Sequence, residues 1–192
     1  MSTNAEMCFC MLKKNGNIFD GFIDVISKAG WHLAKSNETG WPCGPVNSLE
    51  YYKLDRNGNR EDLLVELYTQ YEDYDEYQLT TRPTKLEPTE NDLSYSISDN
   101  FFNLILLEFQ AFDFYCGNMG LESYGFEKNL QDDRYAVGKR KVEYLSDALL
   151  ELAYISNECR KNDYDVKPSV LQEYEKIDLN NGSLYIRHNL VD

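Results

Sequence analysis

Two asparagine–glycine turns, each flanked by strand-like segments, restrict the fold of this sequence more than any other feature. DRNGNR, residues 55–60, separates SLEYYKL from EDLLVELYTQY, and apolar and polar side chains alternate along the second arm. The second turn, Asn-Asn-Gly, lies inside KIDLNNGSLYIR. Asn-Gly favours a β-hairpin, because both residues tolerate the backbone angles of the tight turns that match the twist of paired strands. The sequence therefore predicts antiparallel pairing at both places.

The arm that follows the first turn also fits a helix. Leu64, Leu67, Tyr68 and Tyr71 lie at i, i+3, i+4 and i+7, which is the spacing of one helical face. The preceding turn favours the hairpin, and a helix from Glu61 onward stays as the alternative.

Several other segments have recognisable periods. Residues 6–12 read as a buried strand with Cys8 and Cys10 on one face, and a strand begins within 31–34.

A helix is expected at 18–29, with Asn17 as its N-cap and Gly30 just after its end. A second helix follows Ser98 and runs to Gly117. Residues 139–160 give the clearest helical stripe, and a short helix is expected after Pro168. The stripe consists of Val142, Leu145, Leu149, Leu152, Ala153 and Ser156.

Strands and helices alternate here without a regular β-α-β order, so the predicted class is α+β. With 192 residues, the chain is expected to form a single domain over 1–192, with a mixed or antiparallel sheet packed against three to four helices. Residues 82–93, which contain two prolines and no apolar period, are expected to form a loop excursion.

The cysteines and the apolar runs bear on location. Five cysteines at 8, 10, 43, 116 and 159 are an odd and scattered set, which favours reduced thiols over a disulfide framework. No apolar run approaches the roughly 18 residues that span a bilayer, and the first residues show no secretory signal. We expect a cytoplasmic protein.

Net charge is −14, and it is unevenly spread. Residues 61–99 hold eleven acids and two bases, which is −9 in one fifth of the chain. Such a field repels nucleic acid and anionic membranes and attracts basic proteins. An acidic surface that merely keeps the protein soluble is the alternative.

Motifs for common chemistry are missing. The sequence has no GxxxxGK[ST] or GxGxxG loop, and its two histidines, His32 and His188, offer little for a catalytic dyad or a zinc site. The run from Asp55 half-matches a calcium loop, but Arg60 stands where glycine is needed. We therefore expect no cofactor and no metal ion. Glu108, inside an otherwise apolar helix, is the best candidate for a carboxylate with a raised pKa that could serve acid–base chemistry.

Three tyrosines and four carboxylates crowd into QYEDYDEYQL, residues 70–79, which contains no basic residue. Tyrosine supplies stiff contact area, and carboxylates pair with arginine, so the segment suits contact with a cationic macromolecule. A solvated bend is the alternative, because neighbouring carboxylates repel one another. The predicted partner-binding residues are Tyr71, Glu72, Asp73, Tyr74, Asp75, Glu76 and Tyr77.

These features predict a non-enzymatic inhibitor of the immunity or antitoxin type, which occludes a basic, nuclease-like protein and binds neither nucleic acid nor membranes. A phage-type nucleic-acid mimic that inhibits a restriction or CRISPR enzyme is one alternative. It would spread carboxylates over the surface with the spacing of phosphates. A small enzyme that uses carboxylates and a divalent cation is another, and it would gather Glu108 with two further acids. An acidic chaperone or adaptor is the third.

Overall fold

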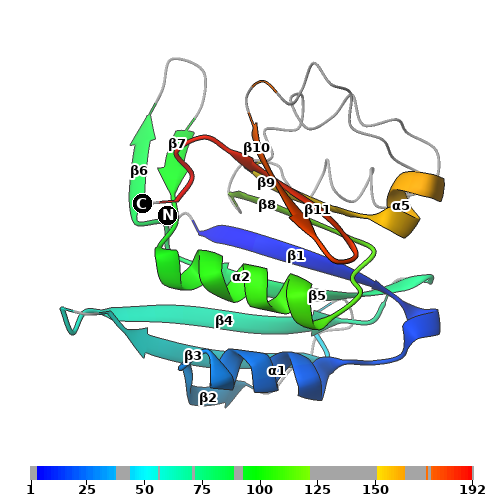
Figure 1. Ribbon diagram of the computed structural model, residues 1–192. Helices are drawn as coiled ribbons and strands as arrows, with labels where there is room; N and C mark the ends of the chain where they lie inside the picture. The colour runs from blue at the N-terminus through cyan, green and yellow to red at the C-terminus, as the bar shows by residue number, and fades with distance from the viewer. Residues whose placement is uncertain are drawn as a thin grey trace.

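One large antiparallel sheet dominates the computed structural model of the chain (Figure 1). The structure describes residues 4–37, 44–55, 57–70, 72–88, 93–121, 151–162, 172 and 174–191. Nine strands form the sheet in the order β10-β11-β9-β8-β1-β5-β4-β3-β2. Their bounds are β1 Ala5–Leu12, β2 His32–Asn37, β3 Asn47–Leu54, β4 Arg60–Tyr68, β5 Tyr74–Thr81, β8 Cys116–Leu121, β9 Leu152–Ser156, β10 Tyr174–Leu179 and β11 Gly182–Arg187.

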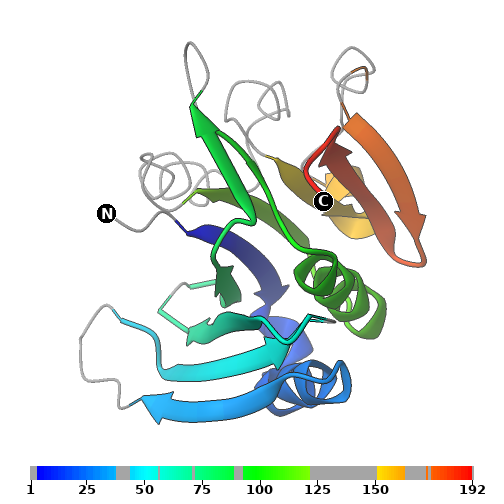
Figure 2. The ribbon, with the colours of Figure 1, turned by 90° about the vertical axis from the view of Figure 1, so that its left-hand side faces the viewer.

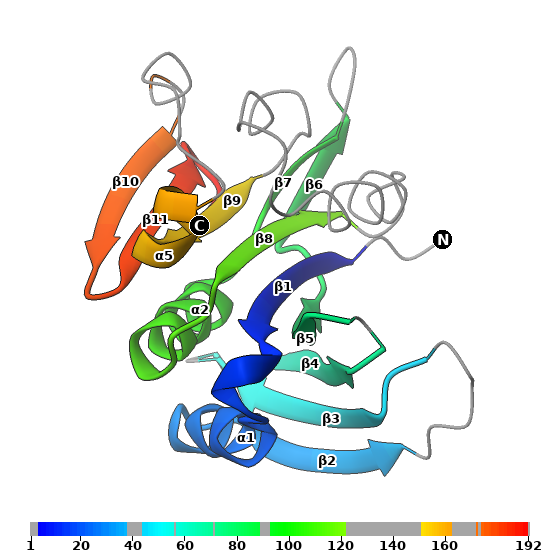
Figure 3. The same cartoon turned by 90° about the vertical axis from the view of Figure 1, so that its right-hand side faces the viewer.

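The sheet consists of two halves of different chain origin. Strands β1 to β5 form one half, strands β8 to β11 form the other, and the ladder between β1 and β8 is the seam that joins them. Every hydrogen-bonded pair of neighbours in the sheet is antiparallel. The strand direction turns steadily from β2 to β10, as expected from the twist of paired strands (Figures 2 and 3).

Helices α1, Phe19–Lys28, and α2, Asp99–Ala111, lie side by side against one side of this sheet, which we call the front face (Figures 1 and 3). A third helix, α5, Asn157–Asn162, packs on the opposite side, the rear face, where Arg160 donates to the hydroxyls of Ser183 and Tyr185. A short 3-10 helix, Lys13–Asn15, follows β1. None of the helices in the described part of the chain has the length and apolarity needed to span a bilayer.

The front face carries the main core. Phe9 of β1 is its centre, with ring centroids 5.5 Å from Phe22, 4.8 Å from Phe109 and 5.0 Å from Phe114. These rings come from a strand, both front helices and the segment after α2, so aromatic packing fixes the helices on the sheet. A smaller apolar cluster under α5, which includes Tyr115, Ala153, Ile155 and Cys159, occupies the rear face of the C-terminal half.

The structure confirms both hairpins and the strand at 6–12. β3 pairs with β4 around the turn of residues 55–59, so the helical alternative for the second arm is wrong. β10 pairs with β11 as predicted. Helix α1 also matches its prediction and Gly30 follows it with φ of 86°, although Ile18 and not Asn17 is its N-cap. Ser98 caps α2, its hydroxyl accepting from the N–H of Phe101.

The predicted α+β class with three to four helices against the sheet is wrong. In the described ranges two α-helices cover the front face, one short helix lies on the rear face, and the nine-stranded sheet is the dominant element. Two expected helices differ from their predicted extent. Residues 152–156 form β9, whose side chains are buried on both faces, and helix α2 ends at Ala111, before β8 begins at Cys116.

Part of the expected loop excursion over 82–93 is a two-stranded ladder. Strand β6, Lys85–Pro88, pairs with β7, Leu93–Ser96, and this hairpin projects beyond the end of the large sheet (Figures 1 and 2). The rest of the stripe over 139–150, the helix after Pro168, and Cys43 and Tyr71 lie outside the described residues.

Candidate functional site

The acidic, tyrosine-rich segment of residues 70–79 continues into β5, which is a central strand of the sheet. The side chains of the part within β5 therefore point alternately to the two faces. Glu72 and Asp73 precede the strand and are exposed. Tyr74 is half-buried, while Asp75 and Glu76 are buried on opposite faces at 7% and 2% exposure. The segment does not form one continuous surface.

Tyr77 belongs to the front core. Its side chain is fully buried, its ring centroid lies 5.2 Å from that of Phe22, and its hydroxyl accepts from the backbone N–H of Ile18. The predicted role of Tyr77 as an anchor for a partner is therefore wrong, because strand alternation places it on the same side as Leu79 and Leu67. Asp75, on the same side, has its pKa raised by burial, and the charge of Lys13 offsets part of this effect.

The exposed acids Glu72 and Asp73 lie on a turn that the 3-10 helix holds in place. The backbone N–H of Lys13 donates to the Asp73 carbonyl at 3.0 Å, and the Lys13 Nζ donates to the Thr69 carbonyl at 3.1 Å. Two contacts from one residue thus fix both sides of the turn between β4 and β5. The carboxylates of Glu72 and Asp73 stay on a defined piece of backbone.

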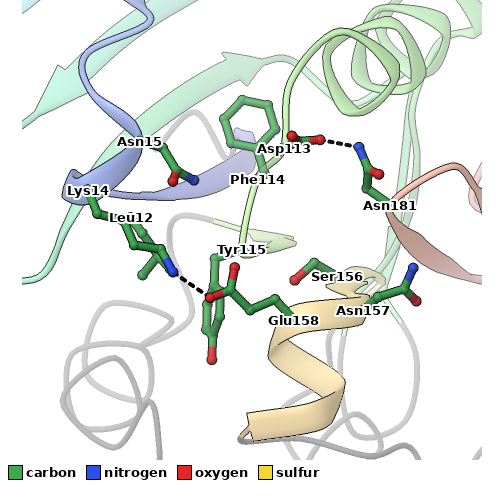
Figure 4. Close-up of a pocket in the computed structure, with 10 residues that line it drawn as sticks. All are labelled: Leu12, Lys14, Asn15, Asp113, Phe114, Tyr115, Ser156, Asn157, Glu158 and Asn181. Atoms are coloured by element: carbon green, nitrogen blue, oxygen red, sulfur yellow. Dashed lines mark hydrogen bonds and ion pairs between the residues drawn. The ribbon is translucent and has the colours of Figure 1, made fainter.

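A polar cleft of about 320 Å³ opens on the other side of this 3-10 helix (Figure 4). Its residues come from the end of β1 and the 3-10 helix, the segment between α2 and β8, the end of β9 with the start of α5, and the β10–β11 turn. They are Leu12, Lys14, Asn15, Asp113, Phe114, Tyr115, Ser156, Asn157, Glu158 and Asn181.

Two polar bridges border the cleft at opposite sides (Figure 4). The ammonium of Lys14 pairs with Glu158 at 2.5 Å, and the Asn181 amide donates to the Asp113 carboxylate. Both Lys14 and Glu158 are about half exposed, so water screens this pair and it contributes little to stability. One cation and two carboxylates leave the cleft with a net charge of −1 at neutral pH.

Backbone hydrogen bonds hold the walls of the cleft together. Ser156 donates its N–H to the Tyr115 carbonyl, and Asn157 donates its N–H to the Asn181 carbonyl. The Ser156 hydroxyl accepts from the N–H of Cys159, which caps the first turn of α5. The cleft is thus a preformed feature lined by amide, carboxylate and ammonium groups, which can bind a polar or cationic group.

Sequence reasoning did not find this cleft. Its members lie in segments as far apart as Lys14 and Asn181, and neither the lysine pair at 13–14 nor the Asn-Asn-Gly turn indicates a binding site by itself. The exposed turn and the cleft together bring four carboxylates to one end of the sheet. We call this the acidic end, defined by Glu72, Asp73, Asp113 and Glu158.

Glu108 lies away from the acidic end, in the buried stripe of α2. It has no exposed surface, and neither of its carboxylate oxygens has a hydrogen-bond partner. Burial raises its pKa to about 10, so the side chain is a neutral carboxylic acid at pH 7. Within the described ranges, no group of three or more His, Cys, Asp or Glu residues is arranged to hold a metal ion.

The rear face carries a second set of acids near the middle of the sheet. Tyr68 of β4 donates to Glu66 at 3.2 Å, and its pKa is raised, mainly by burial and further by Glu66, Glu6 and Glu76. Glu76 and Gln78 of β5 lie beside them in register. Burial, and next the negative charge of these carboxylates, therefore stabilise the protonated form of the Tyr68 phenol.

Comparison with protein-family models, with curated proteins and with solved structures finds no match to this chain.

Proposed function

We propose that the protein is a non-enzymatic inhibitor that binds a basic, nuclease-like protein through its acidic end and covers that protein's nucleic-acid-binding surface. The observation that carries the proposal is the acidic end itself. Its four acidic residues come from three separate segments, and all four are exposed. The 3-10 helix bonds to the backbone of Asp73 and to the side chain of Glu158, and Asp113 lines the cleft beside it. An exposed group of acids is complementary to the lysines and arginines that line a nucleic-acid-binding groove.

The net charge of the whole chain also supports binding to a basic protein. At −14, the protein attracts a cationic partner from a distance and speeds the encounter, while it repels nucleic acid. In this proposal Glu72 and Asp73 meet basic side chains on the partner's surface. The cleft receives one of them between Asp113 and Glu158, where a partner's guanidinium can replace the Lys14 ammonium as the companion of Glu158.

The contact set differs from the one that the sequence predicts. Tyr77, Asp75 and Glu76 are buried and take no part, and Tyr74 contributes only its half-exposed edge. Asp113 and Glu158 are added, because they line the cleft beside the 3-10 helix that is hydrogen-bonded to the turn with Glu72 and Asp73. The mechanism is electrostatic and steric occlusion, and it needs no cofactor.

A pair of charge-matched variants tests the proposal. The first, E72Q/D73N/D113N/E158Q, neutralises the acidic end. The second, D24N/D62N/D99N/E175Q, removes the same charge from exposed residues elsewhere. A deca-arginine peptide and a basic ribonuclease serve as probes, with affinity measured by calorimetry at low and at physiological ionic strength, and with ribonuclease activity as the functional measurement.

We expect the wild-type protein to bind both probes, more weakly at higher salt, and to inhibit the ribonuclease. Four partly exposed charge contacts of about 0.5 kcal/mol each predict a loss of roughly thirtyfold in affinity for the first variant. The second variant should lose only the part due to long-range attraction, about threefold or less. Equal losses in the two variants would show that charge alone, and not the acidic end, determines binding.

A further inference from the structure

The four described cysteines lie close together on the rear face, on both sides of the seam between the halves of the sheet. All four are reduced. Cys8 and Cys10 are on β1, Cys116 begins β8, and Cys159 is in α5, which packs over this part of the rear face. The sequence separates Cys10 from Cys116 by more than a hundred residues, and only the fold brings them together.

Cys10 and Cys116 are directly opposite in the antiparallel ladder of β1 and β8. Residues opposite each other in such a ladder have Cα atoms about 4.5–5.5 Å apart, and their side chains leave the sheet on the same face. A disulfide requires a Cα separation of about 4.4–6.8 Å. The backbone therefore places these two thiols where a disulfide can form without moving a strand.

The surroundings distinguish this pair from the other two cysteines. Cys10 and Cys116 are both partly exposed, whereas Cys8 and Cys159 are buried. The Cys8 thiol donates to Glu6 at 3.6 Å and faces Asn118 across the ladder, so it has no cysteine opposite. Burial, and next the charge of a Cys10 thiolate, raise the pKa of Cys159 to about 12, so Cys159 is a thiol and a poor nucleophile.

We infer that Cys10 and Cys116 form an oxidisable dithiol site, which a hydroperoxide converts to a disulfide across the seam. One thiol, as its thiolate, attacks the peroxide oxygen, which breaks the O–O bond and leaves a sulfenic acid and an alcohol, or water when the oxidant is hydrogen peroxide. The second thiol then displaces hydroxide from the sulfenic sulfur, which forms the S–S bond and releases water. The two cysteines lose two electrons and two protons in total, and the peroxide is reduced.

A disulfide between Cys10 and Cys116 would affect the stability of the whole sheet. The β1–β8 ladder is where the N-terminal and C-terminal halves of the sheet meet. A covalent bond there closes a long loop of chain and restricts separation of the halves in the unfolded state. The oxidised protein should therefore resist unfolding more than the reduced protein does.

Hydrogen peroxide treatment of the folded chain in a C43S background, followed by peptide mapping without reductant, tests the inference. Trypsin releases peptide 1–13 with Cys8 and Cys10, peptide 86–128 with Cys116 and peptide 142–160 with Cys159. We expect one linkage, between peptides 1–13 and 86–128, with the loss of two hydrogens. The linkage should persist in C8S and C159S, disappear in C10S and C116S, and raise the thermal midpoint until dithiothreitol is added.

Three outcomes would overturn the inference. They are a linkage that disappears in C8S and persists in C10S, a linkage to peptide 142–160, and peroxide treatment that yields only sulfinic and sulfonic acids at Cys10 and Cys116. Oxidation of the same protein in denaturant is the control, because pairing set by the fold should lose its preference for Cys116 once the chain is unfolded. Peptide mapping identifies the linkage in a protein that keeps both Cys10 and Cys116. The test therefore gives a result even if the C10S or C116S variant folds poorly.

Discussion

The hydroxyl of Tyr77 accepts a hydrogen bond of 2.9 Å from the backbone N–H of Ile18, the residue that caps the amino end of α1. The first N–H groups of a helix have no partner within the helix, so a buried phenol supplies an acceptor that α1 lacks by itself. The bond joins the centre of β5 to the start of α1, while the ring packs on Phe22. Tyr77 therefore works inside the fold, in positioning α1.

Replacing Tyr77 by phenylalanine should lower stability while leaving binding intact. Tyr77→Phe keeps the ring but leaves the partly buried N–H of Ile18 without its acceptor, and we expect a loss of about 1–2 kcal/mol in the free energy of unfolding. Tyr77→Ala should cost about 3–5 kcal/mol, because it also opens a cavity. Urea denaturation measures both. The affinity of Tyr77→Phe for deca-arginine should equal that of the wild-type protein. A clear loss of this affinity would mean that Tyr77 contributes to the binding surface.

Glu108 should make the protein less stable as the pH rises. Its pKa is about 10 in the folded state and 4.5 ordinarily, so the folded protein holds a proton that the unfolded chain releases. Stability from this group is therefore complete below pH 4.5 and is lost steadily between pH 4.5 and 10. At 1.36 kcal/mol per pH unit, the loss by pH 7 is about 3 kcal/mol.

The variant Glu108→Gln isolates this effect, because the amide is similar in shape and does not titrate. Its stability relative to wild type should improve by about 3 kcal/mol between pH 4.5 and pH 7. Glu175→Gln, at an exposed position of β10, is the matched control and should show no such trend. Denaturant unfolding at a series of pH values provides the measurement. A constant difference between Glu108→Gln and wild type would mean that Glu108 is ionised in the folded protein.

The hairpins could be predicted from sequence because their signals are local. Asn57-Gly58 lies between arms with clear patterns, and Gly58 has the positive φ of 81° that such a turn requires. The strand β9 could not be predicted in the same way. Leu152 and Tyr154 pack into the front core, while Ala153 and Ile155 pack under α5, so both faces are apolar and no alternation remains. A strand buried on both faces has a continuous apolar sequence that cannot be distinguished by its period from a buried helix.

The candidate site was predictable only in part. Asp75 and Tyr77 lie on one side of β5 because side chains alternate along a strand, but the sequence did not show which side of this segment faces the core. Exposure of Glu72 and Asp73 agrees with a charged bend. The cleft had no local signal, because Lys14 and Glu158 become neighbours only when β1 and β9 join the same sheet through β8.

Removing the cap of α2 should destabilise the front core. The Ser98 hydroxyl accepts from the Phe101 N–H at 3.1 Å and donates to Glu61 of β4, so it links the helix start to the sheet. Ser98→Ala loses both bonds, and we expect a loss of about 1–2 kcal/mol in unfolding free energy. Ser98→Thr keeps the hydroxyl and should lose only a few tenths of a kcal/mol. Similar stabilities of the two variants, measured by thermal or urea unfolding, would contradict the capping role.

Gly182 should be intolerant of any side chain, for a reason different from that at Gly58. A Cβ at Gly182 would lie 2.4 Å from the Ile155 carbonyl oxygen and 2.7 Å from the Ser156 Cα, which are backbone atoms of β9 that cannot move aside without breaking the ladder. We expect Gly182→Ala to cost about 3 kcal/mol. At Gly58 a Cβ meets nothing, and only the positive φ opposes it, so Gly58→Ala should cost about 1 kcal/mol. Urea unfolding of the two variants should rank Gly182→Ala as clearly the less stable. The opposite order would mean that β11 packs less closely on β9 than the register of Gly182 with Ser156 requires.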